Sequence, residues 1–317
     1  MMDFLHKTGL ENIYKYDDFE KRRVVLRDGR DAFVWFSLID GHGILDTEFW
    51  ENPEFYSEDY REEFSANLDS FTSPEEHLRI YEKINKRQFK QFRKLVNQKT
   101  KFLEIGSSFG GVIKHVDSIR PERCDALEPN KKDVSFLKSK LENTNVINSL
   151  FENYEFESKY DLVVSFEVLE HVFNLTKFLT KLSNITESGA RVNFEVPNHR
   201  DALLVNYKNE RYQSFYYHKS HVHYFTPESL KMIFSNFGFD GEVSSFQMYP
   251  FYNQIFWSYN NQPQKNAIDA LNYPKLHNDD KVNRKINKFL KKTNKQYYKL
   301  MNDNLCGDCL IYKGKRL

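Results

Sequence analysis

Cysteine is scarce in this chain, which excludes the small domains held together by disulfides or zinc. The 317 residues include 3 cysteines: Cys124, Cys306 and Cys309. They make no disulfide framework, and a reduced, cytoplasmic protein is the simplest interpretation. Cys306 and Cys309 have the spacing of a metal site, but a structural zinc ion needs four ligands and the chain has no second pair. We interpret them as small residues beside a final strand over residues 309–312.

Long apolar runs and an excess of one charge are also missing. Lys and Arg total 46 against 45 acids, a net charge of +1, so no strong general attraction to nucleic acid is expected. The apolar runs are too short to span a bilayer. The segment 1–12 carries an early acid and no apolar core, so we expect no signal peptide. These features favour a soluble enzyme with a small-molecule partner, no membrane contact and an oligomeric state that the sequence leaves open.

The most informative segment that is present is a glycine turn within residues 102–112, FLEIGSSFGGV. A short apolar run precedes Gly106, and a helix is expected after Gly111. A strand, a glycine turn and a helix in this order open a doubly wound nucleotide-binding fold, in which the backbone approaches a ligand closely. The turn does not fit a dinucleotide, because Ser108 replaces the glycine of that motif and Glu104 would repel a phosphate. S-adenosylmethionine (SAM), which bears an ammonium and no phosphate, suits Glu104 better.

Further strands and helices alternate after this turn. Apolar runs predict strands over 124–128, 145–149, 160–166 and 191–196, and we expect a helix with one apolar face between the last two. Glu128 ends the second strand, where a doubly wound fold places the acid that binds ribose hydroxyls. The pattern predicts a mostly parallel sheet covered by helices on both faces.

Together, the stretches LEIGSSFGG, YDLVVSFEVLEHV and HVHYFTPESLKMIFSNFGF, with Glu128, resemble the class I SAM-dependent methyltransferases. The resemblance covers roughly residues 73–248 and is greatest to the small-molecule branch of ubiquinone-pathway O-methyltransferases and deoxysugar C-methyltransferases. It implies a Rossmann-like, doubly wound seven-stranded sheet. It also implies SAM contacts at Glu104, Gly106, Ser107, Gly110, Glu128, Pro129, Leu150, Phe151, Glu167 and Val168. Ser108 stands where the family often has glycine, and we expect the loop to tolerate it.

We expect four segments along the chain. Residues 1–72 would form an N-terminal lid and substrate region, and 73–248 the SAM-binding core. Residues 249–304 would form a helical insertion, and 305–317 the final core strand. Ser73 and Pro74 cap a predicted long helix whose apolar face runs from Leu78 to Val96. Tyr56 and Tyr60 lie four residues apart in the lid and would cover the SAM sulfonium by cation–π contact, or else pack the lid onto the core.

A histidine cluster follows the fifth strand and offers a general base for an alcohol acceptor. The resemblance matches His221 to the catalytic histidine of the deoxysugar enzymes, and His223 is a second catalytic candidate. Those enzymes carry an acid where this chain has Ser220, which favours methylation of oxygen over carbon. Tyr217, Asn198 and Arg200 are candidate substrate contacts, with packing or surface roles as the alternatives.

The segment Glu167–His171, EVLEH, allows a second interpretation. On a helix start, Glu167, Glu170 and His171 would share one face. Some O-methyltransferases with a similar motif bind a divalent cation there, whereas many relatives carry it without metal. We therefore expect no metal, with these three residues as the candidate ligands if an ion is bound.

The sequence thus predicts a SAM-dependent methyltransferase that acts on a hydroxyl of a small, sugar-like or phosphorylated metabolite, with His221 as base. A role in bacterial surface-polysaccharide biosynthesis is an expectation from the resemblance. A sugar C-methyltransferase is one alternative. The others are an RNA methyltransferase, favoured by lysine-rich stretches at 83–94 and 281–299, and a non-catalytic SAM-binding protein.

Overall fold

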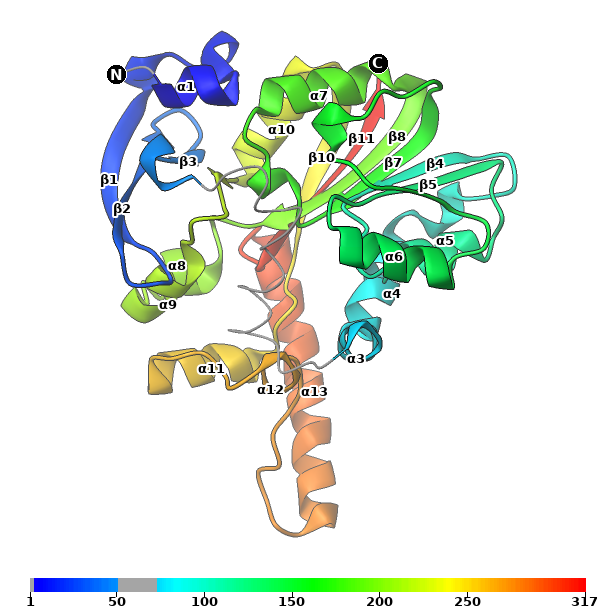
Figure 1. Cartoon of the computed structure of the whole chain (residues 1–317). Coiled ribbons are helices and arrows are strands. Elements are labelled where there is room, and N and C mark those ends of the chain that lie inside the picture. Colours follow the sequence, from blue (N-terminus) through cyan, green and yellow to red (C-terminus); the bar gives the residue numbers. More distant parts are fainter. Residues whose placement is uncertain (1–2, 51–72) are drawn as a thin grey trace.

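The computed structural model describes residues 3–50 and 73–317, and its centre is a seven-stranded sheet (Figure 1). The strand order is β6-β5-β4-β7-β8-β11-β10. Five neighbouring strands are parallel, and β11 runs antiparallel to both β8 and β10. The predicted doubly wound α/β fold is confirmed. The strands are β4 (Lys101–Ile105), β5 (Arg123–Leu127), β6 (Asn145–Ile147), β7 (Tyr160–Phe166), β8 (Thr186–Pro197), β10 (Phe239–Phe246) and β11 (Cys309–Arg316).

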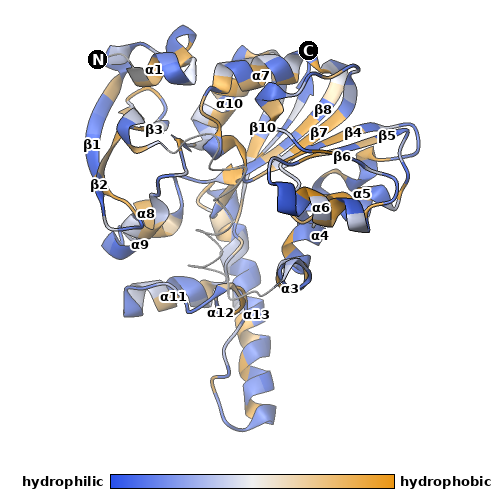
Figure 2. Ribbon diagram, in the orientation of Figure 1, coloured by the Kyte–Doolittle hydropathy of each residue, from blue (hydrophilic) through white to orange (hydrophobic). Residues whose placement is uncertain are grey.

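Helices cover both faces of this sheet, so its strands are apolar on both sides (Figures 1 and 2). In β4, Leu103 and Ile105 belong to the core shared with α7 and α10, whereas Phe102 belongs to the core on the other face. This alternation follows from the two-residue period of a strand. The first face carries α7 (Leu175–Asn184) and α10 (Pro227–Asn236), and the second carries α4 (Glu82–Phe92), α5 (Ile113–Asp117) and α6 (Lys131–Lys140).

The long helix expected from Ser73 is interrupted, so that prediction is wrong in one respect. Ser73 does cap a helix, accepting a hydrogen bond from Glu76 N at 3.2 Å, but α3 (Pro74–Ile80) ends at Tyr81 and α4 begins one residue later. The Tyr81 ring packs on His77 at 4.5 Å, and His77 packs on Phe109 of the glycine turn at 5.1 Å between ring centroids. The break therefore bends the helix around the turn.

A second, four-stranded antiparallel sheet that the sequence did not predict stands beside the first (Figure 1). Its strands are β1 (Phe19–Val25), β2 (Asp31–Ser37), β3 (Gly43–Leu45) and β9 (His223–Tyr224). The first three come from the N-terminal region, and β9 comes from the segment before α10. The short helices α1 (Asp3–Thr8), α8 (Ala202–Val205) and α9 (Glu210–Tyr216) flank it. The N-terminal region is thus joined to the core through β9.

Three helices lie between β10 and β11: α11 (Phe251–Asn260), α12 (Ala267–Leu271) and α13 (Asp280–Asp303). The helix predicted for the lysine-rich stretch is confirmed as α13, which projects away from the sheet (Figure 1). Among the described residues, no helix has the length and apolar character needed to cross a membrane.

A buried ion pair fixes α4 to the sheet. Arg87 of α4 donates two hydrogen bonds, of 2.5 and 2.6 Å, to the Glu195 carboxylate of β8. Gln88 and Gln91 donate to the same carboxylate at 3.0 and 2.8 Å. The Glu195 side chain is fully buried, so its charge depends on these four bonds.

Glu195→Ala should therefore destabilise the fold by about 3 kcal/mol, because it leaves the Arg87 guanidinium buried without its partner. Arg200→Ala, which breaks the exposed Arg200–Glu228 pair, should cost less than about 1 kcal/mol. Denaturant unfolding of both variants measures the difference. Equal losses would contradict a structural role for the buried pair.

Candidate active site

The glycine turn adopts the backbone shape that its residues require. Gly106, Ser108 and Gly110 all have a left-handed φ, of 75°, 48° and 81°. A Cβ on Gly106 would lie 2.3 Å from Cγ2 of Val168, so only glycine fits there. Ser108 accepts a conformation that favours glycine, which agrees with the expectation that the loop tolerates it.

The Glu128 carboxylate, directly after β5, holds this turn in place. Its Oε2 accepts a hydrogen bond from Ser108 N at 2.8 Å, and its Oε1 accepts one from Asn130 N at 3.0 Å. Asn130 in turn caps α6 through Lys132 N and Asp133 N. Glu128 therefore links the first and second strand ends of the site.

Glu104, in β4, is a buried carboxyl group that the described residues do not fully hydrogen-bond. It is 3% exposed, and its Oε2 has no hydrogen-bond partner among the described residues. Burial, reinforced by the nearby Glu128 charge, raises the pKa of the Glu104 carboxyl well above its usual value. A cationic ligand group would relieve this cost by pairing with the carboxylate.

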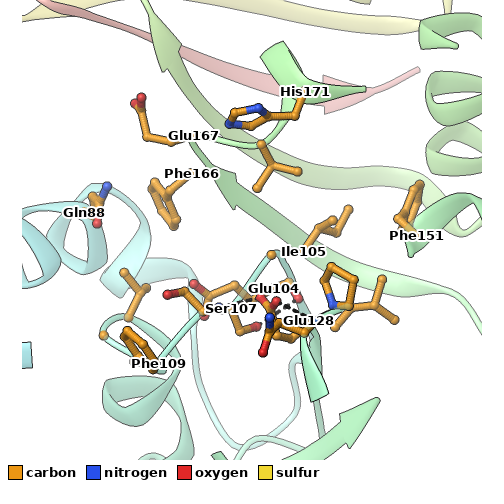
Figure 3. Close-up of a pocket in the computed structure, with 18 of the residues that line it drawn as sticks. Gln88, Glu104, Ile105, Ser107, Phe109, Glu128, Phe151, Phe166, Glu167 and His171 are labelled. Carbon is orange, nitrogen blue, oxygen red and sulfur yellow. Dashed lines mark hydrogen bonds between the residues drawn. The ribbon is translucent and has the colours of Figure 1, made fainter. Parts of the chain in front are cut away.

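A cavity of about 380 Å³ opens above these residues (Figure 3). Of the ten contacts predicted for SAM in the described part of the chain, nine line it: Glu104, Gly106, Ser107, Glu128, Pro129, Leu150, Phe151, Glu167 and Val168. Gly110 lies behind the turn, with Leu137 at 2.6 Å from the position of a Cβ. Tyr56 and Tyr60 of the predicted lid lie outside the described residues.

The sequence interpretation missed the wall that α3 and α4 contribute. Its side chains are His77, Leu78, Tyr81, Ile84, Asn85 and Gln88. They recur at helical spacing, and the apolar ones were interpreted as a core face. The polar Asn85 and Gln88 on that same face were the signal that it lines a pocket.

Glu167 directly follows β7 and has a left-handed backbone conformation. Its φ is 55°, its backbone N donates to Glu195 O at 2.8 Å, and its Oε1 is buried without a hydrogen-bond partner among the described residues. Burial, together with the Glu195 charge, raises the pKa of Glu167 to about 8. A left-handed backbone and a shifted carboxyl pKa at the same residue are features that cluster at functional sites.

Glu170, His171 and His221 come together next to the cavity. Their ligand-type atoms all lie within 4.8 Å of one another. His171 Nε2 is 3.7 Å and His221 Nε2 is 4.0 Å from Glu170 Oε1, and neither Glu170 oxygen has a hydrogen-bond partner among the described residues. His171 lines the cavity, whereas His221 lies behind it. Glu167, predicted to share their face, instead lies with Glu195 and Cys309.

Hydrogen bonding determines which His171 nitrogen carries the proton. His171 Nδ1 lies 2.7 Å from the Ser220 carbonyl, which can only accept, so the proton is on Nδ1 and Nε2 is the basic nitrogen of the ring. Burial lowers the pKa of His171 to about 4, and the ring is neutral near pH 7. Burial also lowers the pKa of His221, with a further contribution from His171.

His223 lies away from the cavity, in β9. It is 1% exposed, and its Nδ1 lies 3.1 Å from Nε2 of the buried His42. Burial lowers the pKa of both histidines. The pair joins β9 to the loop before β3.

The three predicted substrate contacts also lie outside the cavity lining. Asn198 donates to the carbonyls of Leu305 and Gly307 at 3.0 and 2.7 Å, and Arg200 pairs with Glu228 at the surface. The Tyr217 hydroxyl lies 2.9 Å from His199 Nε2, and its ring belongs to the core of the small sheet.

The fold and the site together define a class of protein: a Rossmann-like α/β methyltransferase with its ligand pocket at the carboxyl ends of the parallel strands. Residues 74–242 match the family model described as "Methyltransferase domain", and the chain belongs to that family. It is a SAM-dependent methyltransferase, and SAM is its cofactor.

Solved structures agree on the fold. A SAM-dependent methyltransferase from Archaeoglobus fulgidus is 17% identical, with a TM-score of 0.50 over 81% of this chain and 100% of that chain. A chain of the complex between the Haloferax volcanii Trm112 methyltransferase activator and a methyltransferase is 11% identical, with a TM-score of 0.50 over 83% and 96%. Identities this low show the shared fold alone. No curated protein matches the sequence.

Glu104→Gln should stabilise the cofactor-free protein and weaken cofactor binding. Because the folded protein raises the Glu104 pKa, this residue contributes its full stability only below roughly pH 4, and that contribution falls as pH rises. The variant should melt at a temperature higher by a few degrees at pH 7 and show a flatter pH dependence. Thermal melts and titration with S-adenosylhomocysteine measure both effects. A lower melting temperature with unchanged affinity would contradict this account.

Proposed function

We propose that the protein transfers a methyl group from SAM to a hydroxyl oxygen of a small, sugar-like or phosphorylated acceptor. The observation that carries this proposal is the imidazole of His171 in the pocket wall, with its proton fixed on Nδ1 by the Ser220 carbonyl. A neutral imidazole whose Nε2 carries no proton is the form that can accept a hydroxyl proton.

The pocket residues fit SAM by their chemistry. Glu104, buried with an unpartnered oxygen, suits the ammonium of the methionine part. Glu128 suits the ribose hydroxyls, and Leu150 and Phe151 suit the adenine ring. When bound, SAM supplies an electrophilic methyl group on a sulfonium. Transfer is an in-line displacement, so the main contribution of the protein is to align the acceptor and exclude water.

The proposed base is the Glu170–His171–His221 cluster, with His171 facing the acceptor. This modifies the sequence prediction, in which His221 was the base, because His221 lies outside the cavity lining. Glu170, 1% exposed, lies near both histidines and would stabilise an imidazolium formed when the proton arrives. Ser220 at the position of the deoxysugar enzymes' acid supports oxygen over carbon as the methylated atom.

His171→Gln should lower kcat/KM by about 100-fold or more while leaving S-adenosylhomocysteine affinity within about 2-fold. Activity is measured as S-adenosylhomocysteine release against a panel of sugar phosphates and nucleotide sugars. His115→Gln is the matched control, because His115 is half-buried in α5 and outside the pocket lining. Full activity of His171→Gln would reject the proposed base. Cofactor binding without turnover on any acceptor would instead favour the non-catalytic alternative.

A divalent cation is a second candidate, favoured by the same cluster. Glu170, His171 and His221 offer three ligand atoms, and within residues 3–50 and 73–317 the Glu170 oxygens have no hydrogen-bond partner. His171 is oriented by a backbone carbonyl, as metal-bound histidines usually are. A carboxylate with two imidazoles suits a first-row transition metal. A bound ion would lower the pKa of an acceptor hydroxyl.

Metal analysis separates these two candidates. If the cluster holds an ion, protein dialysed against Mn²⁺ should retain about one equivalent by mass spectrometry, and Glu170→Gln should retain none. Glu228→Gln, a surface carboxylate, is the control. Absence of bound metal, with activity unaffected by EDTA, would reject the cation and leave the histidine as the base.

A further inference from the structure

A second cavity, of about 390 Å³, lies between α3–α4 and the helices that precede β11. Ile84 and Met248 line both this cavity and the cofactor pocket. A molecule in the second cavity therefore lies beside the place where methyl transfer would occur. The cavity is far enough from Glu104 and Glu128 that neither carboxylate lines it.

One wall of this cavity is cationic. Arg79, Lys83 and Arg87 line it from α3 and α4, and no Asp or Glu is among its described lining residues. Arg87 is held by Glu195, and Arg79 is paired with Glu76 at 3.2 Å on the surface. Lys83 is exposed on α4 and has no ion pair or hydrogen bond with the described residues. The Lys83 ammonium and the mostly exposed Arg79 guanidinium are therefore the charges that a ligand can reach.

The opposite wall is apolar and carries an aromatic ring. It includes Ile268 and Leu271 of α12, whereas the ring of Phe246, at the end of β10, lies against the Arg87 guanidinium at 4.0 Å. Tyr298 of α13 also lines the cavity, and its hydroxyl donates to the Met248 carbonyl at 3.4 Å. A flat or apolar group fits against this wall, while an anionic group fits against Lys83.

We propose that the second cavity is the acceptor's binding site for an anionic group, in which Lys83 and Arg79 contact a phosphate and the apolar wall holds the ring or chain attached to it. This inference rests on the proposed function for the reaction itself. The inference narrows the acceptor to a phosphorylated molecule. Residues of α3, α4, α12 and α13 would then determine which acceptor the protein selects. A phosphate offers oxygens that accept from both cations at once.

The test uses 1-naphthyl phosphate as the probe and 1-naphthol as the uncharged analogue. Each is titrated into the 317-residue protein saturated with S-adenosylhomocysteine. The phosphate should bind at least about 10-fold more tightly than the alcohol, which is the effect of one charged contact. Lys83→Gln should weaken phosphate binding about 10-fold and leave naphthol binding unchanged.

Lys86→Gln is the matched control, because Lys86 is a lysine of the same helix, paired with Glu82 and outside the cavity lining. It should change phosphate affinity less than about 2-fold. Equal binding of phosphate and alcohol, or equal weakening by the two lysine variants, would overturn the proposal, since either result means non-specific attraction. Tighter binding of 1-naphthoate than of the phosphate would also overturn the choice of phosphate.

The design keeps this inference separable from the proposed function. S-adenosylhomocysteine affinity is measured for the wild type and for each variant, and we expect it to be unaffected. Failure of the wild type to bind S-adenosylhomocysteine would reject the methyltransferase function. Loss of probe selectivity with intact cofactor binding would reject only the anion site.

Discussion

The active site depends on a single electrostatic constraint: three neighbouring strands of the sheet bring carboxylates to the same buried edge. Glu104 lies in β4, Glu128 follows β5, and Glu167 follows β7. Water is largely excluded there, so each acid must find donors or remain partly unsatisfied. Glu128 is satisfied by backbone N–H groups, whereas Glu104 and Glu167 each keep a buried oxygen without a partner among the described residues. That imbalance is what makes the pocket a site for a cationic ligand.

Much of the sheet could be predicted because its information is local. The run Tyr160–Phe166 is apolar throughout, as a strand buried on both faces must be, and β7 has these bounds. The glycine turn and Glu128 could also be identified from the sequence. Glycines directly after an apolar strand indicate a tight turn, and an acid at the end of the next strand is typical of a ribose-binding position. The alternation of strands and helices also predicted a mostly parallel sheet, whereas the order of its strands comes from the structure.

The parts that the sequence did not reveal depend on contacts between distant segments. In the four-stranded sheet, β1, β2 and β3 pair with their neighbours in the chain, but β9, two residues long, pairs with β3 about 180 positions earlier, and no local pattern encodes that partner. The same holds for the histidines. His223 and His221 are two residues apart and look equivalent in sequence. In the fold, His223 is buried against His42 and His221 lies beside Glu170. The helix break at Tyr81 lies next to His77, whose ring contacts Phe109 of the glycine turn, a contact that the local sequence does not show.

The position of β11 has a consequence for how the protein is made. This strand follows both β8 and β10 in the chain, yet it lies between them in the sheet. Asp308, just before it, accepts hydrogen bonds from the backbone N of Met248 and Tyr249 and so positions a residue shared by the two cavities. During synthesis, the edges of β8 and β10 that face β11 stay unpaired until β11 itself has left the ribosome. The part of the wall that Met248 gives to both cavities is therefore fixed only after β11 has paired with the two strands.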